Sequence, residues 1–323
     1  MAKLINLILP RRKHHMNMKN KITIIGAGMV GSTSAYGLIA ADITEEIALI
    51  DLNQKLAVSQ VMDLQHSVPF WGYTELKVGT YADLKDSRLV VITCGAAQKI
   101  GETRLDLLKK NSAIIRELMP KIFKENPNII VLIVTNPVDI LTNIAVKMFP
   151  GKKKQIFGSG TILDTARFRL LLGEKMSVDP KSVHAYIVGE HGDSEVPLWS
   201  TAMVGNAPIN SFKKLSKQGR KHIFEQAKNA AYAIIEGKQA TYYAIAAGVV
   251  QLARAVLFDK KTVFTVSHPL NGEFGIKGVS LSLPVVIGNQ GVLRQIDLDI
   301  SAEEKRLLQK SAEKLREAEK SLR

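Results

Sequence analysis

The chain has 323 residues, which is enough for two domains or for two lobes that share one core. Hydrophobic residues make up 46% of it, a share typical of globular proteins, and no apolar run approaches the ~20 residues that a membrane helix needs. The single cysteine, Cys94, excludes an internal disulfide bond, so we expect a reducing compartment, the cytoplasm, and no membrane partner.

The formal net charge of +14 makes nucleic-acid binding a function class to weigh. Residues 1–21 hold six lysines and arginines and no acidic residue, whereas the rest of the excess is spread along the chain. The apolar residues 4–9 precede the basic cluster, which is the reverse of the order in a secretory signal. We therefore predict a disordered basic tail over residues 1–20 and no nucleic-acid partner.

A glycine-rich turn follows the tail. Residues 21–25 predict a strand that leads into Gly26-Ala27-Gly28-Met29-Val30-Gly31, and residues 32–40 predict a helix. Glycines in this pattern permit a tight turn and the close approach of a pyrophosphate to the helix N-terminus. A second predicted strand, residues 47–50, ends in Asp51, twenty residues after Gly31. A carboxylate there accepts hydrogen bonds from the ribose hydroxyl groups of NAD and repels the extra phosphate of NADP. The alternative is an aspartate that only caps a turn.

Strands and helices alternate through the rest of the first half. The predicted elements are helices at residues 54–66 and 105–123 and strands at residues 89–93 and 129–134. This alternation predicts an α/β fold with a parallel sheet, whose ligands gather at the carboxyl ends of the strands. Two polar segments, residues 95–104 and 135–139, fall at such ends.

The second half carries charged residues on a predicted helix over residues 161–174, which follows Gly158-Ser159-Gly160. Asp164 and Arg167 share one face of this helix, and Arg169 points to a different environment. A surface ion pair between Asp164 and Arg167, and simple solvation of Arg169, are the structural alternatives to a functional role.

A histidine between two glycines follows an apolar, strand-like run at residues 183–188. The segment reads Gly189-Glu190-His191-Gly192-Asp193. A histidine displayed on such a turn suits acid/base chemistry near neutral pH. An ordinary turn residue is one alternative, and a metal cluster of Glu190, His191 and Asp193 is another. Further helices are predicted at residues 223–236, at residues 242–258 and from Ser301 onward, where a capping-box sequence begins.

Taken in order, these motifs resemble those of one family. The segments that carry the resemblance are Gly26–Gly31, Asp51, Gln98–Arg104, Thr135–Asp139, Asp164–Arg167 and Gly189–Asp193. The sequence resembles the lactate/malate dehydrogenase family, most closely its bacterial L-lactate dehydrogenases, from residue 21 to the C-terminus. The resemblance implies a Rossmann-type NAD-binding domain over residues 21–158, a mixed α/β catalytic domain over residues 159–323, NAD as the cofactor, and a homotetramer.

The resemblance also implies a role for each site residue. His191 resembles the proton donor to the substrate carbonyl, and Asp164 resembles its carboxylate partner. Arg167 resembles the residue that binds the substrate carboxylate with its planar fork, and Arg104 resembles the lid residue that polarises the carbonyl. Further substrate contacts are implied for Gln98, Asn136 and Thr241. The implied cofactor contacts are Gly26, Gly28, Val30, Gly31, Asp51, Tyr81, Gly95, Ala96, Val134, Thr135, Asn136 and Ser159, with no metal.

Gln98 is the residue on which the choice of substrate depends, because the malate branch has an arginine in its place. A neutral amide there would leave the second carboxylate of oxaloacetate unpaired, which costs about a hundredfold in specificity or more. We therefore expect pyruvate and L-lactate as the substrates, at the end of glycolysis. A malate or branched 2-hydroxy acid dehydrogenase is the alternative, and the adjacent Lys99 is a cation that could partly compensate.

Arg169 and His184 resemble the pair that binds fructose 1,6-bisphosphate across a subunit interface in allosteric members of the family. The resemblance therefore implies this sugar bisphosphate as an effector. Three residues depart from the family pattern: Leu56 and Ala97 predict looser NAD binding, and Ile100 predicts a more mobile lid.

Overall fold

The computed structural model describes residues 20–96, 103–212 and 215–322. Within these residues the backbone is organised around one nine-stranded sheet, in the order β3-β2-β1-β4-β5-β6-β12-β13-β14. The strands are β1 (Lys21–Ile25), β2 (Glu46–Ile50), β3 (Glu75–Val78), β4 (Leu89–Ile92), β5 (Ile130–Ile133), β6 (Ile156–Gly158), β12 (Thr262–Asn271), β13 (Lys277–Gly288) and β14 (Gly291–Gln295). Strands β1 to β6 pair in parallel in the order 3-2-1-4-5-6, which is that of a dinucleotide-binding sheet, so the predicted Rossmann-type fold is confirmed.

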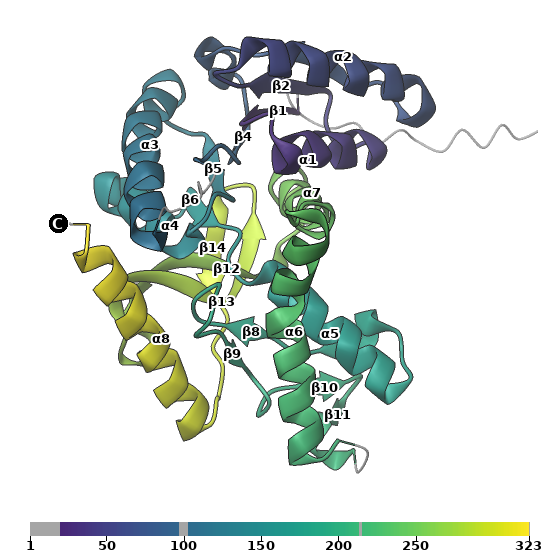
Figure 1. Cartoon of the computed structure of the whole chain (residues 1–323), viewed down its shortest axis with the longest axis vertical. Coiled ribbons are helices and arrows are strands. Elements are labelled where there is room, and N and C mark those ends of the chain that lie inside the picture. The colour runs from purple at the N-terminus through teal and green to yellow at the C-terminus, as the bar shows by residue number, and fades with distance from the viewer. Residues whose placement is uncertain (1–19, 97–102, 213–214, 323) are drawn as a thin grey trace, which may run out of the picture.

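Different helices cover the two faces of this sheet (Figure 1). They are α1 (Met29–Ala40), α2 (Gln54–Trp71) and α7 (Tyr243–Leu257) on one face, and α3 (Arg104–Glu125), α4 (Val138–Met148) and α8 (Ala302–Lys320) on the other. Both faces are therefore apolar, and β1, β2, β4 and β5 are buried at every position. This explains why these strands read as continuous apolar runs rather than as alternating ones.

A smaller layer holds the remaining elements. It contains α5 (Ile162–Met176), α6 (Lys217–Lys238), a three-stranded sheet of β7 (Val183–His184), β10 (Met203–Val204) and β11 (Ala207–Pro208), and a hairpin of β8 (Ile187–Val188) and β9 (Val196–Pro197). Apolar side chains of α5 and α6 pack with those of β7 and β8 in a separate core cluster. This layer and the last three strands form the mixed α/β part that was predicted for the second half.

The second half of the chain also completes the first half's sheet. Helix α7 packs against α1, where a Cβ added to Gly37 would lie 3.0 Å from a methyl group of Val250. Strand β12 joins the edge of β6 through the pair Ser267 and Gly158. Neither contact was predicted, and strands β3, β6 and β12 to β14 and helix α4 were missed as elements.

The single strand expected over residues 183–188 is wrong, because the structure divides it into β7 and β8. At the break the Ala185 carbonyl accepts a hydrogen bond from Arg169 Nε at 2.9 Å, and the Ile187 amide donates to Thr165 Oγ1 at 3.0 Å. Side chains of α5 thus form hydrogen bonds with backbone groups that, in a continuous strand, would pair with a neighbouring strand. Two helices also exceed their predicted bounds: α1 begins at Met29 rather than residue 32, and α2 continues beyond residue 66 to Trp71.

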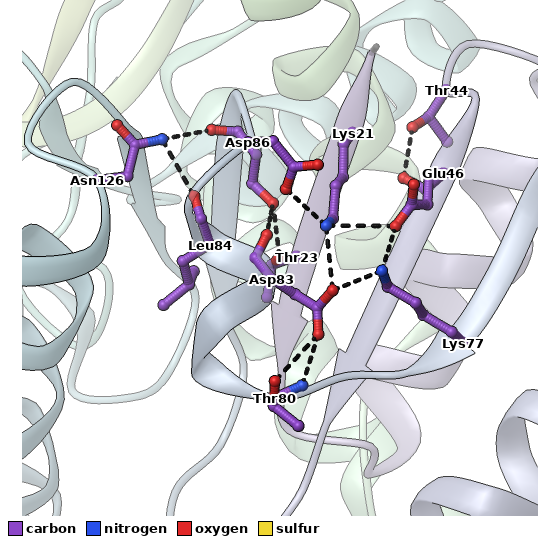
Figure 2. Close-up of polar contacts among 11 residues, drawn as sticks. Lys21, Thr23, Thr44, Glu46, Lys77, Thr80, Asp83, Leu84, Asp86 and Asn126 are labelled. Atoms are coloured by element: carbon purple, nitrogen blue, oxygen red, sulfur yellow. Dashed lines mark hydrogen bonds and ion pairs between the residues drawn. The ribbon is translucent and has the colours of Figure 1, made fainter. Parts of the chain in front are cut away.

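An ionic cluster around the buried Lys21 ties strands β1 to β3 together near the amino ends of β1 and β2 (Figure 2). Lys21 is 2% exposed, and its Nζ lies 2.7 Å from Asp86 Oδ1, 3.1 Å from Asp83 Oδ1 and 3.3 Å from Glu46 Oε1. Lys77 pairs with the same Glu46 and Asp83 carboxylates. Because ligands of such sheets bind at the carboxyl ends of the strands, this cluster has a structural role at the opposite edge.

Candidate functional site

The glycine-rich turn between β1 and α1 is shaped for close backbone contact. Gly26 has φ +114°, and a Cβ there would lie 2.5 Å from the Cys94 amide nitrogen. A Cβ on Gly31 would lie 1.9 Å from the Gly26 carbonyl oxygen, whereas one on Gly28 would meet no atom within 4 Å. The first and third glycines are thus required by packing. Gly28, the N-cap residue of α1, leaves open space at the positive end of the helix, where a phosphate binds favourably.

Asp51 lies at the carboxyl end of β2, beside this turn. Its Oδ2 accepts a hydrogen bond from the Ala27 amide at 2.7 Å, and its Oδ1 accepts one from the Asn53 amide at 2.8 Å. Two backbone donors therefore fix the carboxylate next to the glycine turn. In that position the carboxylate can accept hydrogen bonds from the hydroxyl groups of a ribose, and its negative charge would repel a phosphate on the same sugar.

Two adjoining cavities extend from the turn along the carboxyl ends of the strands. One has a volume of about 370 Å³ and contains Gly26, Gly28, Asp51 and Tyr81 in its wall. The other has a volume of about 270 Å³ and contains Val30, Val134, Thr135 and Asn136. Thr93, Gly95 and Ala96 line both, so the two cavities form one elongated cleft. Ser159, a predicted cofactor contact, is 4% exposed and lines neither cavity.

Asn111 connects two of the backbone segments that line this cleft, a role that the sequence analysis did not predict. It is 3% exposed on α3. Its Oδ1 accepts a hydrogen bond from the Ala96 amide at 2.8 Å, and its Nδ2 donates one to the Asn136 carbonyl at 2.7 Å. The signal available in the sequence was an asparagine on the apolar face of an amphipathic helix, where a buried amide needs specific partners.

Asp164 joins the predicted catalytic residues into one cluster. Its Oδ2 lies 2.6 Å from His191 Nδ1, and its Oδ1 accepts a hydrogen bond from Arg167 Nη1 at 3.0 Å. The Asp164 and Arg167 side chains are 4% and 13% exposed, so the surface ion pair considered as the alternative is excluded. Because Asp164 occupies Nδ1, the chemistry of His191 falls to its other ring nitrogen, Nε2.

Asp139 positions the histidine segment from the other side. It is 2% exposed in the first turn of α4, and its Oδ2 accepts a hydrogen bond from the His191 amide at 2.7 Å. Gly189, two residues before the histidine, has φ +90° and supplies a left-handed backbone conformation that favours glycine. Since Asp139 follows Asn136 by three residues, this bond also brings the histidine segment to the end of the cleft.

The charges of the cluster favour an imidazolium. Burial alone would lower the pKa of His191, but the charge and hydrogen bond of Asp164 outweigh it and raise the pKa to about 9. Burial likewise opposes ionisation of Asp164, yet His191 and then Arg167 hold the pKa of that carboxyl below its usual range. The raised pKa of His191 and the lowered pKa of Asp164 both indicate that the two groups form a charged pair at neutral pH.

Two further buried carboxyl groups face this pair. Burial raises the pKa of Asp139 to about 6. Burial, followed by the nearby negative charge of Asp164, raises the pKa of Glu195 to about 8. Glu195 is 7% exposed, and its Oε1 has no hydrogen-bond partner among the described residues. Asp139 was expected only as part of the Thr135–Asp139 motif, without a role of its own. Glu195 was missed, because nothing in its local pattern indicates burial beside His191.

The side chains around His191 do not gather into the metal cluster considered as an alternative. Glu190 Oε2 accepts hydrogen bonds from the amide and hydroxyl groups of Ser194, and Asp193 Oδ1 accepts one from the Tyr232 hydroxyl at 2.8 Å. Over residues 20–96, 103–212 and 215–322, no group of three or more histidine, cysteine or acidic side chains could hold a metal ion.

The remaining predicted residues lie as follows. Thr241 is half-buried in the short link between α6 and α7. Arg169 bonds to the Ala185 carbonyl, and its guanidinium lies 4.9 Å from the centre of the Tyr186 ring. His184 is exposed on β7, next to Ala185. Gln98 lies outside the described residues, as do Ala97, Ile100 and residues 1–19 of the predicted tail, and Arg104 is described only as the first residue of α3. Asn20, the last residue of that tail, is described, and its carbonyl accepts a hydrogen bond from the Glu45 amide at 3.0 Å.

Comparison with known proteins gives matches over nearly the whole chain. Residues 20–158 match the family described as lactate/malate dehydrogenase, NAD binding domain, and residues 161–322 match its α/β C-terminal domain. The L-lactate dehydrogenase of Thermoanaerobacter pseudethanolicus is 45% identical over 299 residues, which cover 91% of this chain and 96% of that protein. The L-lactate dehydrogenase of Thermus aquaticus is 44% identical over 307 residues, which cover 94% and 99%.

Solved structures agree with these matches. A lactate dehydrogenase from a deep-sea metagenome library of the Medee basin superposes with a TM-score of 0.91 at 38% identity, covering 94% of this chain and 99% of that one. The minor L-lactate dehydrogenase of Enterococcus mundtii superposes with a TM-score of 0.90 at 37% identity, with the same coverage.

Proposed function

This chain belongs to the lactate/malate dehydrogenase family of NAD-dependent oxidoreductases, and from that premise we propose that it is an L-lactate dehydrogenase, which interconverts pyruvate and L-lactate. The observation that carries the proposal is the cluster in which Asp164 holds both His191 and Arg167 beside a dinucleotide cleft. We place the reaction in the cytoplasm, at the end of glycolysis. Among the described residues, no helix has the length and apolar character needed to cross a bilayer.

The cleft fits NAD. The open space at Gly28 leaves room for the pyrophosphate at the start of α1, and the Asp51 carboxylate is held where it can accept the adenosine ribose hydroxyls. Val30, Thr135 and Asn136 line the end of the cleft that is tied to His191 through Asp139. Bound NADH supplies a hydride to the carbonyl carbon of the substrate.

His191 supplies the proton for the carbonyl oxygen. With Nδ1 bonded to Asp164, Nε2–H is the donor, and a pKa of about 9 keeps the ring charged at neutral pH. When pyruvate becomes lactate, the proton leaves Nε2 and the Asp164 carboxylate then faces a neutral ring. In the reverse direction the neutral ring accepts the hydroxyl proton of lactate, so the same residue serves as acid and as base.

Arg167 binds the carboxylate of the three-carbon acid. A guanidinium offers two parallel N–H groups to a carboxylate, a geometry that lysine cannot reproduce. Its bond to Asp164 fixes it on the same side of the helix as the carboxylate that orients His191. The substrate's carboxylate and carbonyl oxygen are therefore bound by residues that share one positioning group.

The family resemblance in the sequence supports the remaining substrate contacts, and Asn136 also lines the cleft. We propose that Arg104 polarises the carbonyl, that Asn136 contacts substrate and cofactor, and that Thr241 lies near the substrate methyl group. Gln98 favours pyruvate over oxaloacetate because it offers no charge to a second carboxylate.

Parallel assays of NADH oxidation by pyruvate, oxaloacetate and 2-oxoisocaproate test the substrate. Pyruvate is expected to have the highest kcat/KM, and Gln98→Arg is expected to move the preference toward oxaloacetate. A wild-type preference for oxaloacetate would overturn the assignment of pyruvate, and unchanged ratios in the variant would show that Gln98 does not select the substrate.

We also propose fructose 1,6-bisphosphate as an activator, bound at Arg169 and His184. Arg169 is held by the Ala185 carbonyl and the Tyr186 ring, the two residues that follow the exposed His184 in the chain. Activation requires that the sugar bisphosphate bind the active state more tightly than the inactive one. Pyruvate saturation curves with and without it test this, and changing Arg169 to Gln and His184 to Asn together is expected to abolish the response but to spare the rate at saturating pyruvate. An intact response would place the effector elsewhere.

A homotetramer is the proposed assembly. Apolar side chains on α1, α2, α5, α6 and α7 are exposed in the single chain, among them Tyr36 (44%), Met62 (52%), Leu170 (49%) and Tyr232 (50%). Exposed apolar surface of this kind is typical of subunit contacts. Light scattering after size-exclusion chromatography measures the mass directly, and a monomer at micromolar concentration would contradict the proposal.

A further inference from the structure

A cavity of about 410 Å³ lies away from the catalytic cluster, among α3, α4, the start of β13 and the last turns of α8. Figure 1 shows the carboxyl end of α8 next to α3 and α4 on that side of the sheet. We call it the α8 pocket. None of its lining residues lines the cofactor cleft, and neither Arg169 nor His184 belongs to it.

The charge of the α8 pocket is strongly positive. Arg116, Lys147, Arg316 and Lys320 line it, and among the described residues of its wall Glu319 is the one that is acidic. Glu319 is already engaged, because its Oε1 lies 2.6 Å from Lys147 Nζ and its Oε2 accepts a hydrogen bond from Asn143 Nδ2 at 2.7 Å. Three cations of the lining are therefore left without an acidic counterpart within it.

Favourable interaction with the negative ends of helices explains the positions of only some of these cations. Lys147 and Lys320 lie in the last turns of α4 and α8, where a cation is favourable beside the negative end of the helix. Arg116 lies in the middle of α3, where no helix end needs it. Arg316 Nη2 donates to the Lys277 carbonyl at 3.0 Å, which uses one of five guanidinium N–H groups and fixes the side chain at the pocket.

The rest of the wall is apolar and open. Ile144, Met148 and Leu322 contribute apolar surface, and a Cβ added to Gly278 would meet no atom within 4 Å. The volume lies in the range of small-molecule sites. Three uncompensated cations beside an apolar wall match a ligand with several negative charges and a small apolar part.

We propose that the α8 pocket binds a small organic diphosphate. Arg116, Arg316 and Lys320 bind the two phosphate groups, since guanidinium and ammonium groups form their strongest hydrogen bonds with such oxygens, and the apolar wall holds the organic part. The proposal does not depend on the reaction that the chain catalyses. It places an anion site between α3 and α8, against the apolar side chains of α4, the helix that also carries Asp139.

Calorimetric titration of the full chain, saturated with NADH so that the cofactor cleft is filled, tests the proposal. The probes are inorganic pyrophosphate and isopentenyl diphosphate, and the second is expected to bind at least tenfold more tightly because its hydrocarbon part is buried. Arg116→Gln and Lys320→Gln are each expected to weaken binding about tenfold (~1.4 kcal/mol). Both side chains are exposed, so neither change should disturb folding.

Two further variants separate this site from charge in general. Glu319→Gln removes the one negative charge of the wall and is expected to tighten binding, a gain that a merely damaged fold would not give. Arg306→Gln is the matched control: it removes one exposed arginine of the same helix, α8, which lies outside this pocket and outside the proposed effector site, and it should leave the affinity for both probes unchanged. No binding at millimolar probe, equal affinity for both probes, indifference to Arg116→Gln and Lys320→Gln, or loss of binding in the control would each overturn the proposal.

Discussion

Replacing Asp164 with asparagine removes the carboxylate that holds both His191 and Arg167. In the parent, Asp164 keeps the His191 pKa at about 9, although burial alone would lower it below 6.5. A fall of ~2.5 pKa units corresponds to ~3.4 kcal/mol of lost support for the imidazolium. Asparagine is almost the same size, so it makes this change without opening a cavity.

The magnitude follows from the fraction of protonated ring. At pH 8 a group with a pKa of about 9 is ~90% protonated, whereas one with a pKa of 6.5 is only ~3% protonated. Pyruvate reduction at pH 8 should therefore fall ~30-fold from this cause alone, and further because Asp164 no longer orients the ring. The KM for pyruvate should also rise, since Arg167 loses its partner at 3.0 Å.

The assay is kcat/KM for NADH oxidation by pyruvate as a function of pH. The parent profile should be flat at neutral pH and decline with a midpoint near 9, and lactate oxidation should rise toward the same midpoint because it needs the neutral ring. Asp164→Asn should move both midpoints to 6.5 or below. A variant profile still centred near 9 with unchanged kcat/KM would refute the assignment of Asp164 as the group that controls His191.

Asp139→Asn is expected to change the same pH profile as Asp164→Asn, but by a smaller amount. Its amide oxygen can still accept the His191 amide hydrogen at the position that Oδ2 occupies now, 2.7 Å away, so the segment stays in place. Only the charge is lost, and Asp139 contributes less than Asp164 to the His191 pKa. The midpoint should therefore shift downward by less than in Asp164→Asn. A larger shift would reverse the roles of the two carboxylates.

Three further changes test separate parts of the protein. Arg167→Lys should raise the KM for pyruvate about a hundredfold, because the bidentate pair with the substrate carboxylate is lost; an unchanged KM would move the carboxylate site elsewhere. Asp51→Ser should weaken NADH and strengthen NADPH binding in fluorescence titrations, since the negative charge beside Ala27 is removed; an unaltered preference would contradict the cofactor assignment. Asp83, whose pKa is lowered to about 2 despite burial by its bonds to Lys77, Thr80 and Lys21, stabilises the fold above pH 3.8, and this contribution of about 2 kcal/mol is lost as the pH falls toward 2. Urea unfolding at a series of acidic pH values should show a weaker pH dependence in Asp83→Asn than in the parent, and identical slopes would argue against the ionic cluster.

The sequence by itself determined the features that depend on a few neighbouring residues. The glycine turn and Asp51 are specified locally, since a left-handed φ at Gly26 and a tight approach at Gly31 admit no other residue. Gly189, two residues before His191, is also specified locally, and so is the capping box at Ser301, where the structure has both reciprocal hydrogen bonds. Motif spacing then sufficed to identify the family, and with it the residues expected at the site.

The resemblance implied that His191 pairs with Asp164, but only the tertiary structure decided how these residues are held together and which other residues contact them. The bond between His191 and Asp164 joins residues 27 apart in the chain, and the one between His191 and Asp139 joins residues 52 apart. Asp139 lay in a recognised motif but had no predicted role, and Asn111 and Glu195 had no local pattern that indicates one, because burial beside a charged pair depends on how distant elements pack. The division of residues 183–188 into β7 and β8 arose in the same way, since the side chains of Thr165 and Arg169 on α5 take the backbone bonds that a continuous strand would have used.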